Sequence, residues 1–142
     1  MNIRAYSRSI RVTGAYSIIY LAGVTSIAEL YTNRSLLDDF DGQARDVFAR
    51  INQTLVEQHC AELHDLVAMT VFITNQSLGT RFTQIRREIF NERDFPTSAL
   101  ITIVALANLG MMVEVQATAI IPSGVEKQSI SLSGFIIFMC CF

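Results

Sequence analysis

The stretch MMVEVQATAII, residues 111–121, decides the fold because its hydrophobic pattern repeats every second residue. Successive side chains of a β-strand point to opposite faces, so this repeat predicts a strand with one buried face. The buried face would carry Val113, Val115, Ala117, Ala119 and Ile121. The opposite face would carry Met112, Glu114, Gln116, Thr118 and Ile120. This second face is mixed, as expected if it lies in a cleft or a subunit interface.

Four further segments have strand-like sequences. Residues 66–73 (LVAMTVFI) are rich in apolar and β-branched side chains, which predicts a buried strand. Residues 6–12 alternate in polarity, and residues 17–22 follow them across the turn signal Thr13-Gly14. The two segments are therefore expected to form a hairpin. Residues 99–106 are expected to form another strand.

Two amphipathic helices are expected between these strands. Apolar residues at helical spacing predict the first over residues 42–59, after a cluster of acidic residues at 38–41 that suits a helix N-terminus. The second is expected over residues 77–93, with Ser77 or Thr80 as its N-cap. Pro96 lies beyond its end, and Arg86 and Arg87 are expected on its solvated face.

The order of these elements is ββαβαββ. Helices inserted between strands imply crossovers that place both helices on one face of a mixed sheet, which is an α+β architecture. The uncovered face of the sheet would then need a partner, and this favours an oligomer. Residues 122–142 follow the last strand as an apolar appendage, and no linker divides the remainder into domains.

Composition and charge narrow the class of protein. The 142 residues fit one domain, with 51% apolar residues, 17% charged residues and a formal net charge of −2. The arginines are scattered and there is one lysine, so a nucleic acid is not expected as the partner. No apolar run is long enough to span a membrane, so no membrane partner is expected either.

The cysteines and the N-terminus bear on the compartment. Cys60, Cys140 and Cys141 show no disulfide-framework spacing, which indicates a reducing compartment and a cytoplasmic protein. The first residues lack the apolar core of a secretory signal. Their arginines leave an organellar transit peptide as an alternative.

Glu114 is the first candidate for chemistry. It stands between two valines, where it is either a solvent-facing carboxylate or an acid that holds a water in a cleft. His59, Cys60 and His64 do not converge by helical periodicity and have no fourth ligand nearby, so no metal site is expected. Nucleotide-binding and nucleophile-elbow motifs are absent from the sequence, and no cofactor is expected.

Five stretches together carry a family resemblance. Residues 5–12 (AYSRSIRV) resemble P-Y-S-Q-A-V-x-V, and residues 19–23 (IYLAG) resemble a strand ending in S-G. Residues 66–73 resemble D-V-V-K-x-T-V-F-L, residues 95–96 resemble the start of F-P-x-R, and residues 113–119 resemble V-E-I-E-A-I-A. These motifs, in this order, are similar to those of the RidA (YjgF/YER057c/UK114, L-PSP) family. A RidA-like domain is therefore expected over residues 1–121, with an appendage over residues 122–142.

The resemblance implies a chorismate-mutase-like fold, a homotrimer and a small-molecule cleft between subunits. In the best-known branch of the family, a cleft arginine grips the substrate carboxylate and a glutamate positions water. Reactive enamines or imines are then hydrolysed to ketoacids and ammonia. Glu114 matches the glutamate and is implied as catalytic, and Tyr6 matches a cleft tyrosine.

Three departures from the family pattern concern this cleft. Ser98 stands where the family has its arginine, Ala22 where it has serine, and Thr83 where it has asparagine. Loss of a bidentate guanidinium removes the carboxylate clamp, so the chain resembles the arginine-lacking branches. Thr97, Ser98 and Glu114 can still form a polar cleft for a neutral or cationic ligand.

Three functions are compatible with these residues. The first is an enamine or imine deaminase with an altered substrate, and the second is a non-catalytic trimer that binds a metabolite or regulates a partner. The third is RNA cleavage, which the acidic pI of about 5.6 disfavours. The sequence leaves open whether Arg11 or Arg81 enters the cleft from a neighbouring subunit.

Overall fold

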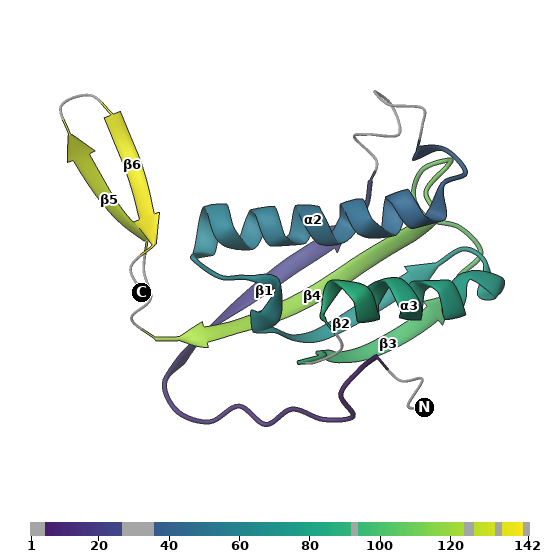
Figure 1. The fold of residues 1–142 in the computed structure, drawn as a ribbon, viewed down its shortest axis with the longest axis horizontal. Helices are drawn as coiled ribbons and strands as arrows, with labels where there is room; N and C mark the ends of the chain where they lie inside the picture. Colours follow the sequence, from purple (N-terminus) through teal and green to yellow (C-terminus); the bar gives the residue numbers. More distant parts are fainter. Residues whose placement is uncertain (1–4, 27–35, 92–93, 124–126, 133–134, 141–142) are drawn as a thin grey trace.

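Strands and helices alternate along the described part of the chain, which comprises residues 5–26, 36–91, 94–123, 127–132 and 135–140, the last two as backbone only. Figure 1 shows these elements. In chain order they are β1 Tyr16–Val24, α2 Phe40–His59, β2 Leu66–Ile73, α3 Gly79–Ile89, β3 Thr97–Thr102, β4 Val113–Pro122, β5 Lys127–Leu132 and β6 Phe135–Cys140. Short 3-10 turns at Leu63–Asp65 and Gln76–Leu78 precede β2 and α3.

The main sheet is mixed and has the strand order β1-β4-β2-β3. β4 pairs antiparallel with both β1 and β2, whereas β2 and β3 are parallel neighbours. Parallel neighbours need a crossover connection, and α3 supplies it between β2 and β3. A mixed four-stranded sheet with two helices confirms the predicted α+β fold class. β5 and β6 form a separate antiparallel hairpin.

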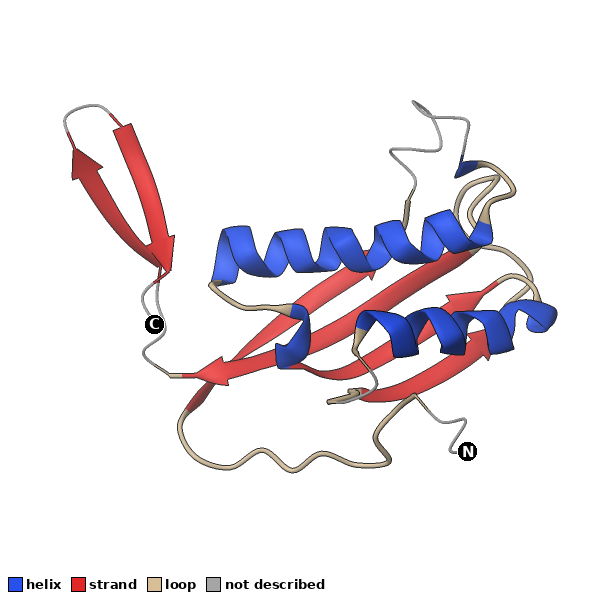
Figure 2. Ribbon diagram, in the orientation of Figure 1, coloured by secondary structure: helices blue, strands red, loops and turns tan. Residues whose placement is uncertain are grey.

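Both helices lie on one face of the main sheet, as Figure 2 shows. The alternate residues Val113, Val115 and Ala119 of β4 are fully buried on this face. Helix residues meet them, and the rings of Phe48 in α2 and Phe82 in α3 stack with centroids 5.9 Å apart. The repeat in residues 111–121 therefore decides which face of the sheet the helices cover.

Gln43 connects α2 to the loop that leads into β4. Its amide nitrogen donates to the carbonyl oxygens of Leu36 and Gly110 at 2.9 and 2.8 Å. Its amide oxygen accepts from the backbone nitrogen of Met112 at 2.8 Å. The Gln43 side chain is buried, and its three bonds satisfy part-buried backbone groups of the two neighbouring segments. Gln43 thus fixes the start of the strand that carries Glu114.

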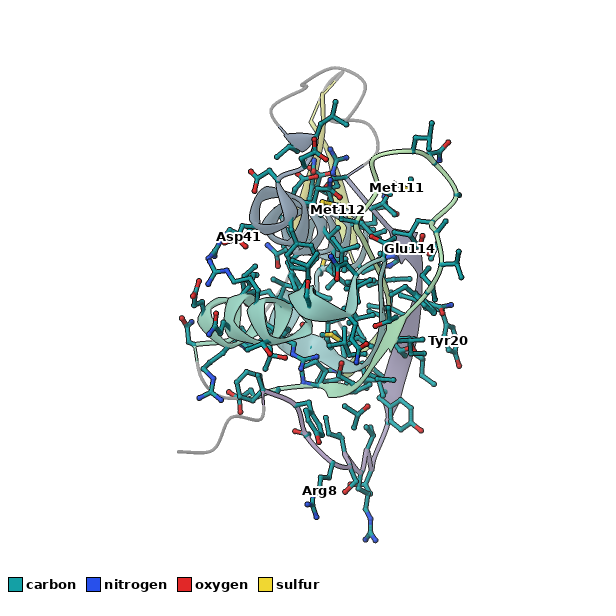
Figure 3. All side chains as sticks on the ribbon, turned by 90° about the vertical axis from the view of Figure 1, so that its right-hand side faces the viewer. Arg8, Tyr20, Asp41, Met111, Met112 and Glu114 are labelled. Carbon is teal, nitrogen blue, oxygen red and sulfur yellow. The ribbon has the colours of Figure 1, made fainter. Side chains whose placement is uncertain are left out.

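Neither α2 nor α3 covers the other face of the sheet (Figure 2). Tyr20 is 79% exposed and points away from the helices in Figure 3. The alternate residues Tyr16 and Ile18 of β1 are also exposed, as is Ile101 of β3. An exposed apolar sheet face of this kind is typical of an interaction surface. The oligomer expected from the sequence stays a prediction.

The prediction of a strand at residues 6–12, paired in a hairpin, is wrong for this chain. Ser7 alone forms a β-bridge, which pairs it parallel with Thr97 at the edge of β3. Its backbone nitrogen donates to the Pro96 carbonyl at 3.1 Å, and its hydroxyl donates to the Phe95 carbonyl at 2.5 Å. Alternation is a local signal and does not identify the partner. The segment leaves β1 unpaired on that side and docks on the opposite edge of the sheet.

Other boundaries differ from the expected ones by a few residues. The strand expected at 99–106 spans 97–102, and the helix expected at 77–93 spans 79–89. Neither Ser77 nor Thr80 is the N-cap; instead, the Asn75 side chain accepts from the backbone nitrogen of Ser77 at 2.9 Å, one turn earlier. A 3-10 turn inserted before α3 moves the capping position, which a sequence pattern does not show. The strand at 66–73 has the predicted bounds.

Candidate functional site

A pocket with a cavity volume of about 560 Å³ lies over the open face of the sheet. It is bounded by residues 6–8 of the N-terminal segment and by parts of β1, β2, β3 and β4. Three of the predicted site residues, Tyr6, Thr97 and Ser98, are among its lining residues. The docking of Ser7 on the edge of β3 brings this end of the pocket together, because it holds Tyr6 next to the start of the strand.

The lining also includes residues that the sequence motifs did not identify. They are Arg8, Tyr20, Thr70, Gln116 and Thr118. The last two belong to the mixed face of residues 111–121, so the alternation placed them on the correct face without indicating a pocket. Arg8 and Tyr20 line the same pocket although they belong to different segments, because the N-terminal segment runs past one end of the sheet from the β3 side to β1 (Figure 1).

The exposure of Arg86 differs from the sequence-based prediction. Arg86 belongs to the buried face of α3 and is 2% exposed, so the prediction that it lies on the solvated face of this helix is wrong. Its Nη1 donates to the Ser98 hydroxyl at 2.5 Å, and its guanidinium lies 5.5 Å from the centre of the Phe82 ring. The pattern failed because arginine is rarely buried without a paired acid.

Burial changes the protonation of this arginine. Removal from water lowers the pKa of Arg86 to about 10, and the neighbouring Tyr6 acts in the opposite direction. The buried Nε of Arg86 has no hydrogen-bond partner among the described residues. A buried, incompletely bonded guanidinium is costly, which makes this position a candidate for function.

Glu114 lies outside this pocket. In the sheet, Ser98 of β3 lies beside Met69 of β2, and Met69 lies beside Ala117 of β4. Ala117 is three residues along β4 from Glu114. At about 3.3 Å per residue, this separation is about 10 Å along the strands, in addition to two interstrand spacings. Figure 3 agrees, since Glu114 lies well away from Arg8, with Tyr20 between them in this view. One chain therefore does not bring Glu114 to Ser98.

Glu114 instead lies against the bulge in β1. A Cβ atom built on Gly23 would be 2.1 Å from its Oε1, so the carboxylate packs directly on the glycine backbone. Ala22 is the neighbouring residue in the same irregular part of the strand and is exposed. The predicted residues thus divide into two groups: Tyr6, Thr97 and Ser98 at the pocket, and Glu114 with Ala22 at the bulge.

The remaining candidates belong to neither group. The Thr83 hydroxyl donates to the carbonyl of Gly79 at 3.0 Å within α3, and Thr83 is not among the residues that line the pocket. Arg81 pairs with Asp41 at the start of α2, and this contact lowers the pKa of the Asp41 carboxyl. Arg11 is exposed and outside the lining.

The metal-like residues and the cysteines have other surroundings. No group of three or more potential metal ligands gathers among the described residues. The ring of His64 packs edge-on against Phe90, with centroids 5.8 Å apart. Cys60 is disulfide-bonded, so the expectation of reduced thiols is wrong at this position. Cysteine pairing depends on proximity in space, which spacing along the chain does not show.

In the part of the chain that is described, no helix has the length and apolar character needed to cross a bilayer.

The fold and the pocket define a small α+β protein with a ligand-sized cavity on an open sheet face. The family model for Endoribonuclease L-PSP matches residues 1–121. The chain therefore belongs to this family, as the motifs predicted. A comparison with curated proteins gives no match.

Solved structures agree with this assignment. A YjgF/YER057c/UK114 family member from Mycobacterium tuberculosis is 27% identical, with a TM-score of 0.63, and covers 82% of this chain and 86% of its own. The Rid family protein YyfA from Yersinia pestis is 28% identical, with a TM-score of 0.64 and coverage of 80% and 86%. Yeast Mmf1 is 17% identical, with a TM-score of 0.57 and coverage of 81% and 86%, and shares the fold.

Proposed function

We propose that this protein binds a small polar metabolite in the pocket that Tyr6, Thr97 and Ser98 line. The observation that carries this proposal is the cavity of about 560 Å³, whose lining includes these three residues, which were candidates from the sequence. Pockets of this volume suit small organic ligands. Its hydroxyl groups and the Gln116 amide offer the few directed polar contacts that give such a site specificity.

The candidate reaction is hydrolysis of a reactive enamine or imine to a carbonyl compound and ammonia. Glu114 is the proposed acid that holds the attacking water, as the family resemblance implies. Because Glu114 and Ser98 lie apart within one chain, this reaction requires a second copy to bring them together. A homotrimer is the proposed assembly, and the exposed side chains of Tyr16, Ile18 and Tyr20 support a contact between copies.

Turnover of in situ enamines tests the reaction. The purified protein is incubated with enamines generated from several amino acids, and ketoacid release is compared with that of Glu114→Ala. Glu57→Ala removes an exposed carboxylate from α2 and serves as the matched control. Turnover that depends on Glu114 and not on Glu57 supports the hydrolase. Rates equal to buffer for every enamine would sink it, and the mass measured by light scattering tests the trimer separately.

A non-catalytic binding protein is the second candidate. It is favoured by the separation of Glu114 from the pocket and by Ser98 in place of the family's arginine. Ligand binding with unchanged affinity in Glu114→Ala, and without product formation, distinguishes this candidate from the hydrolase. RNA cleavage is not proposed, because the net charge is −2 and the arginines form no basic stripe in the sequence.

A further inference from the structure

Cys60 is disulfide-bonded, and the sequence limits what its partner can be. The chain has two other cysteines, Cys140 and Cys141, and both belong to the appendage at residues 122–142. A disulfide within one chain must therefore join Cys60 to one of these two. Such a bond connects the end of α2 to the end of β6, because Cys60 directly follows α2 and β6 spans Phe135–Cys140.

Cys60 is a fixed point of the domain. It is the C-cap of α2, where its backbone nitrogen donates to the carbonyl of Leu55, a fully buried residue. The chain then enters β2, and Leu66 of β2 pairs with Ala119 of β4, three residues before β4 ends. Cys60 and the start of the appendage therefore lie towards the same end of the main sheet (Figure 1).

The hairpin of β5 and β6 has little support of its own. Its strands pair from Lys127 and Cys140 at the base to Leu132 and Phe135 at the other end. Figure 1 shows the hairpin apart from the main sheet and both helices, on the side of the molecule where α2 ends. An isolated two-stranded hairpin is marginally stable in water, and covalent bonds commonly support such small elements. A bond from the base of the hairpin to Cys60 would hold it at the point where its strands begin and end.

We propose that Cys60 and the cysteine pair at residues 140–141 form a redox-controlled tether, a disulfide that holds the appendage at the end of α2 and releases it on reduction. Glutathione disulfide is a sufficient oxidant. The Cys60 sulfur and one sulfur of the pair form a bond, their two thiols give up two electrons and two protons, and the oxidant becomes two glutathione thiols. Reduction by glutathione runs the same exchange backwards.

The third cysteine gives the tether a second form. Whichever of Cys140 and Cys141 is not bonded to Cys60 is adjacent to the one that is. Its thiolate can attack the sulfur of Cys60, which forms a new disulfide, breaks the old one and leaves the first partner as a thiolate. This exchange involves no net oxidation, so the appendage stays tethered in both forms.

The lysine content of the chain makes the pairing directly measurable. Lys127 is the only lysine, so a protease that cleaves after lysine divides the chain into residues 1–127, which carry Cys60, and residues 128–142, which carry both other cysteines. The full chain is equilibrated in glutathione buffers from reduced to oxidised, its free thiols are alkylated, and it is unfolded and digested. Mass spectrometry should find the fragments joined after oxidation, heavier than the undigested alkylated chain by one water, and separate after reduction.

Cysteine variants identify the partner. Cys60→Ser should give separate fragments in the oxidised buffer, and so should Cys140→Ser combined with Cys141→Ser, which leaves residues 1–121 unaltered. The two single variants of the pair are matched controls for each other. Loss of the link in one of them names the partner, and survival in both shows that either thiol can serve. Fragments that separate in every buffer, or a bond that joins two chains and doubles the mass before digestion, overturn the tether.

Digestion of the folded protein tests whether the tether holds the hairpin. Lys127 is the first residue of β5, so cleavage after it requires this strand to open. We expect reduction to speed the cleavage at least about tenfold, because a hairpin without the bond opens more often. Cys60→Ser should be cut at the faster rate in both buffers, and a ¹⁵N amide spectrum shows that its domain is folded. Equal rates for the oxidised and reduced parent would overturn the hold on the hairpin, and neither result depends on a ligand in the pocket.

Discussion

Replacement of Arg86 by methionine is expected to stabilise the free protein. Burial lowers the pKa of Arg86 from its ordinary value to about 10, and a shift of this size corresponds to a cost of about 3 kcal/mol for the charged form. The substitution loses the hydrogen bond to Ser98 and the contact with the Phe82 ring, each worth about 1 kcal/mol. The net expectation is a free energy of unfolding higher by about 1 kcal/mol, since methionine fills a similar apolar volume.

Urea unfolding at one protein concentration measures this difference. Arg87→Met is the control for loss of one positive charge from α3, with a change within about 1 kcal/mol expected. The size of this cost also depends on pH. A base whose folded pKa is lowered destabilises the fold below that pKa, so the cost is relieved as pH rises above about 10. The advantage of Arg86→Met should therefore shrink above pH 10. A loss of more than about 2 kcal/mol in Arg86→Met would refute the view that this charge is uncompensated.

Three further predictions concern other parts of the fold. Gln43→Leu removes three hydrogen bonds to part-buried backbone groups and should lower the free energy of unfolding by about 3 kcal/mol, at about 1 kcal/mol for each bond, in urea titrations. A change under about 1 kcal/mol would contradict its bridging role. Gly23→Ala should displace the Glu114 carboxylate with little loss of thermal stability. If the protein hydrolyses an enamine, reduced turnover in this variant would connect the orientation of Glu114 to catalysis, whereas an unchanged rate would argue against the connection. The Arg81 contact lowers the pKa of Asp41, so Asp41→Asn should be less stable than the parent at neutral pH, and the gap should close as pH falls below about 4; a gap independent of pH would exclude the charge as its cause.

The site divides into parts that the sequence could and could not predict. Tyr6 and Ser98 were expected from family motifs and Thr97 as a polar neighbour of Ser98, and all three are among the residues that line one pocket. Glu114 was expected from its isolation in a strand, yet the register of β4 places it outside that pocket. Motifs align residues along a chain, whereas the distance between two strands depends on sheet order, which no single motif contains.

The burial of Arg86 also could not be predicted from the sequence, and the reason is energetic. Two adjacent arginines on an amphipathic helix predict solvent exposure, because burial of a guanidinium costs several kcal/mol in most environments. Arg86 is buried nevertheless, because two contacts partly offset this cost. Ser98, 12 residues further along the chain, accepts a hydrogen bond from the guanidinium, and the ring of Phe82 in the same helix lies against it. A local sequence pattern therefore indicates that burial of an arginine is costly, but it does not identify the residues that offset the cost.

Hydrophobic patterning by itself predicted the fold class, the two helices and the strands at residues 66–73 and 111–121, the second of which spans Val113–Pro122 in the structure, because burial of one face selects the register of each element. Only the tertiary structure decided where the segment at residues 6–12 docks, which residues line the pocket, and that Arg86 is buried against Ser98. The physical reason is the range of the interactions. Alternation along a strand reports the nearest layer of packing, whereas a binding site is built from contacts between segments that the chain brings together only after it folds.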